Sequence, residues 1–213
     1  MRVYMQSLGC AKNQVDSEMI LGTLKENITL VKEPNEAELI IINTCAFIEP
    51  ARKEAIETIL EMVEYKIDNN AKLIVCGCLP QRYKDEIANL IPEVDRFISI
   101  SEYNDLPMII NNVIKSDYKY SLEFSPLNRI YSTPNYMRYV KISEGCLNRC
   151  AFCAIPLIRG NLKSRTIESI VEEVKNEVNS GVYEINLISQ DTTKYGWDLY
   201  NKLAIVDLLS ELV

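Results

Sequence analysis

The sequence of 213 residues contains no histidine, one tryptophan, seven glycines and eight prolines. Without histidine, the chain lacks the usual general base and the commonest nitrogen ligand of protein metal sites. No apolar run reaches the roughly 18 residues needed to span a membrane, and the opening MRVYMQSLGC has no signal-peptide core. The net charge of −7 argues against broad binding to a phosphate backbone. We therefore expect a cytoplasmic protein whose chemistry does not depend on histidine.

Seven cysteines stand out against these absences. An odd number in a chain without a secretion signal does not suggest a disulfide framework. A metal site here would be dominated by thiolate, which favours zinc or an iron–sulfur cluster. Cys146, Cys150 and Cys153 fall within the ten residues EGCLNRCAFC. Structural zinc usually takes four ligands in paired C-x₂-C units, and a redox pair would not need Cys146. A 4Fe–4S cluster held by three thiolates would instead leave one iron open to a small molecule.

The first half of the chain alternates strand patterns with helix patterns. We expect strands at 3–7, 38–44, 72–77 and 96–100, because these are short runs typical of buried parallel strands. Helices are expected over about 14–25, from Pro50 with a stripe of Ile56, Ile59, Leu60, Val63 and Ile67, over about 81–90, and over 104–115. This alternation predicts an open α/β domain with a mostly parallel sheet, which we place at 1–117.

Three cysteines of this domain each come just past the end of an expected strand: Cys10, Cys45 and Cys78. The carboxyl ends of parallel strands share one edge, where ligand sites collect. We therefore expect these thiols to meet in space, although they are far apart in sequence. The alternative is three unrelated buried thiols, because free cysteine is often a core residue. Cys76 lies within a strand, and we interpret it as a packing residue.

A connector over 118–135, with poor periodicity, precedes a second unit over 136–213. Its expected elements are a strand at 136–143, a helix from about Thr166 that ends near 179–181, a strand at 183–189 and a helix over 200–213. One βα unit of a barrel takes about 30 residues. The second unit is therefore expected to be the first part of a (β/α) barrel, in a chain cut from a longer protein.

The CxxxCxxC loop after the first barrel strand resembles the signature of the radical S-adenosylmethionine enzymes. The resemblance implies that its three cysteines hold a 4Fe–4S cluster whose open iron binds S-adenosylmethionine, and that electron transfer then yields a radical. Phe152 matches an aromatic position of that superfamily. Gln190 and Asp191 follow the second barrel strand, where the superfamily often contacts S-adenosylmethionine, but they could equally cap a loop. Arg159 and Arg165 could pair with a carboxylate of cofactor or substrate, or could be solvated loop charges.

Segments across most of the chain resemble the methylthiotransferase family: SLGCAKNQVDSE (7–18), IINTCAFIEPARKEAIETILEM (41–62), GCLPQRY (77–83), KISEGCLNRCAFCAIPLIRG (141–160) and QDTTKYG (190–196). The resemblance implies that Cys10, Cys45 and Cys78 hold a second 4Fe–4S cluster, which presents the sulfur to be inserted. Neighbouring Asn13, Asn43 and Thr44 could hydrogen-bond sulfur atoms of that cluster.

Two branches of this family differ in substrate. The motifs resemble the branch that modifies an aspartate β-carbon in small-subunit ribosomal protein uS12, free or in the subunit. The other branch modifies an adenosine of transfer RNA. The family implies a sulfur-group transferase served by an electron donor such as flavodoxin or ferredoxin, with no membrane partner; we do not expect nucleic acid as the direct substrate. Both branches normally continue to a TRAM domain, which this sequence lacks. The alternative of another class is a non-catalytic fragment that binds zinc or iron–sulfur clusters.

Overall fold

The computed structural model describes residues 1–116, 118 and 124–213, and it divides into two units, Met1–Ile130 and Tyr131–Val213. The boundary falls inside the predicted connector, of which residues 119–123 lie outside the described part of the chain, as does Asp117 at the end of the first predicted domain. Within the described ranges, no helix combines the length and the apolar character required to cross a membrane.

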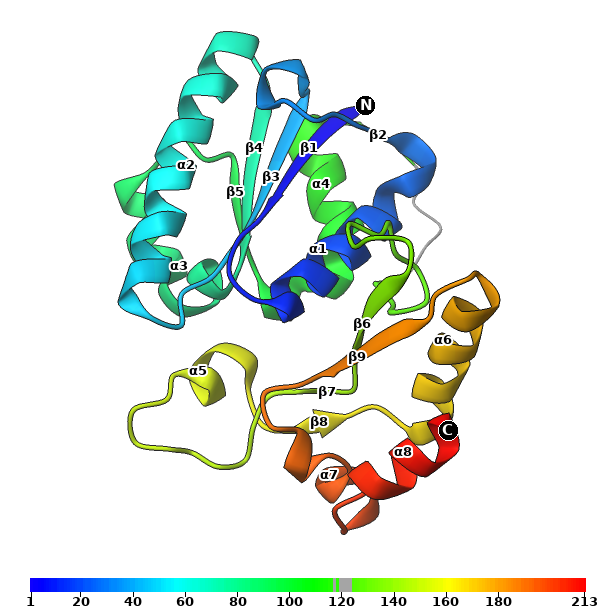
Figure 1. Cartoon of the computed structure of the whole chain (residues 1–213). Helices are drawn as coiled ribbons and strands as arrows, with labels where there is room; N and C mark the ends of the chain where they lie inside the picture. The colour runs from blue at the N-terminus through cyan, green and yellow to red at the C-terminus, as the bar shows by residue number, and fades with distance from the viewer. Residues whose placement is uncertain (117, 119–123) are drawn as a thin grey trace. The chain divides into compact units, whose positions relative to one another are not determined.

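The first unit is a five-stranded parallel sheet with helices on both faces (Figure 1). Its strands are β1 (Arg2–Ser7), β2 (Thr29–Leu30), β3 (Leu39–Thr44), β4 (Lys72–Gly77) and β5 (Arg96–Ser99), in the order β2-β1-β3-β4-β5. Helices α2 (Glu49–Asn69) and α3 (Cys78–Leu90) cover one face, and α1 (Ala11–Leu24) and α4 (Leu106–Ile114) cover the other (Figure 1). The predicted α/β domain is confirmed, with β2 as an additional short strand at the edge.

The apolar runs explain the position of the strands. Every residue of β3, LIIINT, is buried, because a central parallel strand is covered by helices on both faces. The core around it gathers buried residues of the strands, of α1 and α4, and of the 3-10 turn before α4: Val3, Ile20, Leu21, Leu24, Leu39, Ile41, Ile74, Cys76, Ile98, Tyr103, Leu106 and Ile110. Cys76 is fully buried within this core, as expected for a packing residue.

The apolar stripe predicted for α2 is correct for two of its five residues. Ile59 and Val63 are buried, whereas Ile56, Leu60 and Ile67 are 40, 50 and 66% exposed. Helix α2 turns alanine, threonine and methionine side chains toward the sheet as well, so the buried face is rotated from the stripe. Ile56 and Leu60 instead line an open groove between α2 and α3.

Two helices begin three residues earlier than their apolar periodicity predicts. Helix α1 starts at Ala11, directly after Cys10, and α3 starts at Cys78. Proline is tolerated in a first helical turn, so Pro80 does not prevent the early start of α3. As a result, two of the three cysteines of the predicted amino-terminal set stand at helix N-termini.

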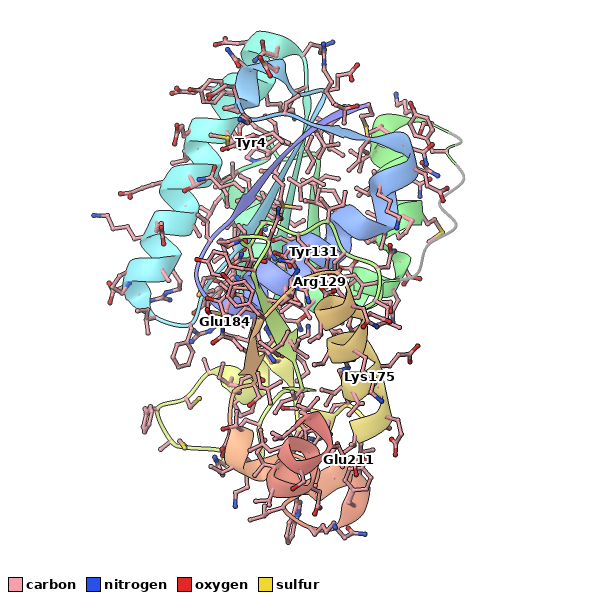
Figure 2. The ribbon with its side chains drawn as sticks, turned by 45° about the vertical axis from the view of Figure 1, so that its right-hand side comes forward. Tyr4, Arg129, Tyr131, Lys175, Glu184 and Glu211 are labelled. Carbon is pink, nitrogen blue, oxygen red and sulfur yellow. The ribbon has the colours of Figure 1, made fainter. Side chains whose placement is uncertain are left out.

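The part of the predicted connector that is described packs against α1. Arg129, labelled in Figure 2, forms an ion pair with Glu18. The two side chains are 0 and 1% exposed. The Ile130 N–H donates to Glu18 O at 3.0 Å. A Cβ atom on Gly22 would lie 2.0 Å from Asn128 O, so the glycine allows this segment to cross the helix closely. Residues 128–130 are therefore fixed to the first unit.

The second unit is built on two parallel strands, β6 (Met137–Lys141) and β9 (Glu184–Ile188), joined through helix α6 (Ile167–Asn179). Two antiparallel strands of two residues each, β7 (Ser143–Glu144) and β8 (Lys163–Ser164), lie between β6 and β9 in the sequence. Helix α5 (Ile155–Arg159) lies between β7 and β8. Helices α7 (Trp197–Tyr200) and α8 (Ile205–Leu212) follow β9. The core comprises Val140, Ile142, Ile170, Val174, Tyr195, Ala204 and Leu208.

The order of strands and helices in this unit agrees with the predicted first part of a barrel. Two predicted elements differ in detail. The strand expected at 136–143 is divided into β6 and β7, and the helix expected at 200–213 is divided into α7 and α8. Asn201, in the left-handed conformation with φ of 52°, ends α7. Helix α5 and strand β8 were not predicted, because each is too short to show a period.

Candidate metal centres

The carboxyl edge of the first sheet brings together the loops of Cys10, Cys45 and Cys78. Thr44 of β3 pairs with Gly77 of β4, so Cys45 and Cys78 follow neighbouring positions on adjacent strands. Cys10 comes after the end of β1, which pairs with the other side of β3. The topology therefore places the three loops at one edge, as the parallel-sheet argument predicts.

Two glycines allow these loops to approach closely. Gly9 has a φ of +89°, and a Cβ atom there would lie 2.5 Å from Cys45 Cβ. Gly77 has a φ of +99°, and its Cβ would lie 2.3 Å from Asn43 Oδ1. Only glycine combines these backbone angles with the absence of a side chain. The glycines of SLGC and of GCLPQRY therefore have a steric role next to their cysteines.

The side chain of Asn13 links the three loops. Its Nδ2 donates to Leu8 O and to Thr44 O, each at 2.9 Å, and the Cys78 thiol donates to its Oδ1 at 3.6 Å. Of the three polar residues expected near cluster sulfur, Asn13 is therefore in contact with a thiol. Asn43 donates to Asn13 O at 2.8 Å, and the Thr44 hydroxyl donates to a carbonyl of β4 at 2.6 Å. These two side chains secure the loops.

The three thiols differ in exposure: Cys10 is exposed, and Cys45 and Cys78 are buried. Over the described part of the chain, no group of three or more His, Cys, Asp or Glu side chains is arranged to hold a metal ion. The loops meet, but the thiols are not set as a finished ligand group. The donors nevertheless fit an iron–sulfur cluster, because cysteine binds iron through a soft sulfur ligand. Cys10 and Cys78 stand at helix N-termini, which favour negative charge.

The second cysteine set lies in one loop, between β7 and α5. Cys146 and Cys153 are half-buried and Cys150 is exposed. The Cys146 N–H donates to Gly160 O at 3.2 Å, which joins the start of the loop to the residue after α5. Gly145, with a φ of +69°, permits this closure, because its Cβ would lie 2.6 Å from Gly160 O. The backbone thus closes the cysteine loop at its base.

Phe152, on this loop, is 90% exposed and is therefore not a core residue. Its predicted contact with S-adenosylmethionine stays a prediction. Asp191 accepts hydrogen bonds from Asn148 Nδ2 at 2.6 Å and from the N–H and hydroxyl of Thr193 at 3.0 and 2.6 Å. The Thr193 hydroxyl is the main cause of a lowered pKa of Asp191. Asp191 thus caps a turn and also ties that turn to the cysteine loop.

Arg159 and Gln190, predicted separately as cofactor contacts, share one carboxylate that sequence reasoning missed. Glu144 Oε1 accepts from Gln190 Nε2 at 2.8 Å, and Glu144 Oε2 lies 3.5 Å from Arg159 Nη1. Lys141 Nζ lies 3.1 Å from the same Oε2. The position of Glu144 directly before the Gly-Cys of the motif was the available signal, but nothing in the spacing showed its partners.

Arg165, the other candidate arginine, is held by the second unit itself. It forms an ion pair with Glu173, donates to Lys141 O at 2.9 Å, and donates to Ser169 O at 3.0 Å. The buried Tyr195 hydroxyl in turn donates to Arg165 O at 2.8 Å, and burial raises the pKa of that phenol. Arg165 therefore secures the loop before α6.

Two family models match the chain, one for each unit. Residues 2–99 match Uncharacterized protein family UPF0004, and residues 140–210 match the Radical SAM superfamily. Among curated relatives, the "Ribosomal protein uS12 methylthiotransferase RimO" of Sulfurihydrogenibium sp. is 48% identical over 213 residues, covering 100% of this chain and 47% of the relative. The protein of the same name from Clostridium botulinum (strain Hall) is 49% identical, covering 99% of this chain and 49% of the relative.

Solved structures share the fold at low identity. The radical S-adenosylmethionine methyltransferase TsrM from Kitasatospora setae matches with a TM-score of 0.61 at 11% identity, covering 99% of this chain and 50% of that chain. The cobalamin-dependent S-adenosylmethionine radical enzyme OxsB matches with a TM-score of 0.60 at 13% identity, covering 99% of this chain and 36% of that one.

The fold of the second unit and its three-cysteine loop, together with the family match, define a radical S-adenosylmethionine domain. With the match of the first unit and the near-50% identity along the whole chain, the chain belongs to the RimO-like methylthiotransferase family. It spans about half the length of these curated relatives.

Proposed function

We propose that the protein to which this chain belongs inserts a methylthio group at the β-carbon of an aspartate in ribosomal protein uS12. The observation that supports it most is the presence of two separate three-cysteine sets in a chain about 48% identical to relatives named uS12 methylthiotransferases. Cys10, Cys45 and Cys78 would hold one 4Fe–4S cluster. Three thiolates leave one iron of such a cluster without a protein ligand.

Cys146, Cys150 and Cys153 would hold the second cluster, with S-adenosylmethionine beside it. When bound, these groups would supply the one-electron chemistry that activates an unreactive C–H bond, and such chemistry does not require a histidine base. The residues of the chain would bind and orient them. Phe152 lies in the cysteine loop, Arg159 follows it, and Gln190 and Asp191 follow β9. We propose all four residues as contacts of S-adenosylmethionine, with Asp191 also holding the loop through Asn148.

We also propose the partners of the protein and its location in the cell. The protein substrate would be uS12, free or in the small ribosomal subunit, and reduction would come from a donor such as flavodoxin or ferredoxin. The reaction would then take place in the cytoplasm. We propose the two domains as 1–117 and 136–213, joined by a connector over 118–135.

Anaerobic reconstitution with iron and sulfide, followed by an iron count, tests the two-cluster part. Two 4Fe–4S clusters predict about eight irons per chain. Cys45→Ala and Cys150→Ala should each remove about half of that iron, since each removes one ligand of a different set. Cys76→Ala is the matched control, because Cys76 is a thiol buried in the core and should leave the iron content unchanged. Four irons that survive Cys45→Ala but not Cys150→Ala would refute the amino-terminal site.

The substrate is tested by mass spectrometry. The reconstituted chain is incubated with S-adenosylmethionine, a reductant and either uS12 or transfer RNA, with the full-length Sulfurihydrogenibium relative as the positive control. A mass gain of one methylthio group on the aspartate peptide of uS12 is expected. A gain on transfer RNA alone would favour the other branch of the family. Iron binding without 5′-deoxyadenosine or any methylthio product would indicate a cluster-binding fragment, and zinc in place of iron would contradict the proposal altogether.

A further inference from the structure

Glu144 collects donors from three separate parts of the second unit. Lys141 is the last residue of β6, Arg159 is the last residue of α5, and Gln190 follows β9. Glu144 itself ends β7, immediately before the cysteine loop. Its side chain is 24% exposed, and that of Arg159 is 3% exposed. One carboxylate thus joins the beginning of the cysteine loop, the helix at its end and the loop after β9.

The two oxygens of this carboxylate have different partners. Lys141 Nζ and Arg159 Nη1 approach Oε2, at 3.1 and 3.5 Å. Gln190 Nε2 donates to Oε1 at 2.8 Å. An ionised carboxylate can only accept hydrogen bonds, so it selects one of the two orientations of the glutamine amide. The NH₂ group must face Glu144, and the carbonyl oxygen of Gln190 must face the other way.

That carbonyl oxygen is left without a partner. Gln190 Oε1 is buried, and it has no hydrogen-bond partner among the residues that the structure describes. A buried acceptor without a donor is costly, so most such atoms in folded proteins are satisfied by protein, water or ligand. Glu144 therefore holds Gln190 in the orientation that offers an acceptor to a donor from outside the chain.

We infer that Glu144 is a positioning residue that fixes the Gln190 amide so that its Oε1 accepts a hydrogen bond from the small molecule bound at the cysteine loop. This inference rests on the proposed function, in which that molecule is S-adenosylmethionine. Glu144 does not need to touch the molecule. It acts through Gln190, because a reversed amide would present NH₂ donors where an acceptor is required.

The test is a double-mutant cycle on the anaerobically reconstituted chain. Glu144→Gln keeps the shape of the side chain but can accept or donate, so it no longer fixes the Gln190 amide. Gln190→Leu keeps a similar volume and removes the acceptor. Affinity for S-adenosylmethionine is measured by equilibrium dialysis, and the change that binding causes in the electron paramagnetic resonance spectrum of the reduced cluster is recorded. Iron content and melting temperature are measured for every variant.

Each single variant should weaken binding of S-adenosylmethionine by about tenfold, the effect of one hydrogen bond. The double variant should also lose only about tenfold, because residues that act as a unit are not additive. Iron content should stay at the wild-type value, and the wild-type spectral change on binding should be reduced in both single variants. If the role of Glu144 is only structural, Glu144→Gln should lower the iron content or the melting temperature and leave the affinity for S-adenosylmethionine per cluster unchanged.

Three results would overturn the inference. Glu144→Gln could bind S-adenosylmethionine as tightly as the wild type, or the double variant could lose about a hundredfold, which would mean independent action. In both cases the proposed function would stand. If the wild-type chain holds iron but does not bind S-adenosylmethionine, the proposed function fails and the inference fails with it.

Discussion

Replacing Gly77 with alanine tests whether the glycine before Cys78 is required for the close approach of the loops. Gly77 has φ +99° and ψ −150°, a region that only glycine adopts readily. A Cβ atom there would lie 2.3 Å from Asn43 Oδ1 and 2.6 Å from Thr44 O. Thr44 O is backbone, and the Asn43 side chain is held by its 2.8 Å hydrogen bond to Asn13 O. Neither atom can move away freely.

Two costs therefore add in Gly77→Ala. The unfavourable backbone conformation costs about 1–3 kcal/mol, and overpacking of a well-packed site costs about 1–3 kcal/mol. The expected loss is about 2–6 kcal/mol, a large part of the roughly 5–15 kcal/mol that stabilises a typical domain. Because the displaced backbone carries Cys78, the variant should also fail to retain the iron of the amino-terminal set.

Gly181→Ala is the matched control, because Gly181 has the same φ of +99° but no atom within 4 Å of the added Cβ. Its cost should be the backbone strain alone, about 1–3 kcal/mol. Urea unfolding is followed by circular dichroism for both units and by fluorescence of Trp197, the single tryptophan, for the second. Equal losses of stability in the two variants, or full iron retention in Gly77→Ala, would refute the steric argument.

Two further predictions concern stability of the first unit. Arg129→Met should cost about 3–5 kcal/mol in urea unfolding, because it removes one partner of a buried ion pair. A loss below about 1 kcal/mol would show that 128–130 are not fixed to α1. Burial alone would raise the pKa of Asp95, but hydrogen bonds led by that from Lys66 lower it. A carboxyl group whose pKa is lower in the folded than in the unfolded state stabilises the fold at pH values above the unfolded-state pKa of about 4. This contribution is lost as the pH falls through the folded-state pKa. The stability gap between wild type and Asp95→Asn should therefore close at acid pH, and a gap independent of pH would contradict this.

The sequence was most informative where burial acts on a whole strand. The segments 38–44 and 72–77 each contain a continuous apolar run, because a strand covered on both faces is mostly lined by apolar side chains, and the structure has β3 and β4 there. The edge location of Cys10, Cys45 and Cys78 followed from topology alone. These predictions needed only the hydrophobic periodicity of the sequence and the rule that the carboxyl ends of parallel strands lie at the same edge of the sheet.

Features that depend on three-dimensional partners were not predictable. Ile56 and Leu60 have helical spacing, but α2 is rotated so that they border a groove. The two-residue strands β7 and β8 have no period to detect. Glu144 showed no sign of its role, because its partner Gln190 is 46 residues away in the sequence. A carboxylate that orients a distant amide can be recognised only when the hydrogen bond is seen.

The two cysteine sets place different demands on the chain. Cys146 and Cys153 are separated by seven residues within one closed loop, whereas Cys10 and Cys78 are 68 residues apart and meet only when three strands are in register. In the unfolded chain, bringing the more distant pair together costs about 2 kcal/mol more, from the logarithmic dependence of loop closure on length. Folding of the sheet already brings the two loops to one edge, so this entropic cost does not arise again in the folded state. The cluster binding proposed for the amino-terminal set would therefore be coupled to folding of the whole first unit, whereas that proposed for the second set would depend mainly on the local loop and on the residues that orient it.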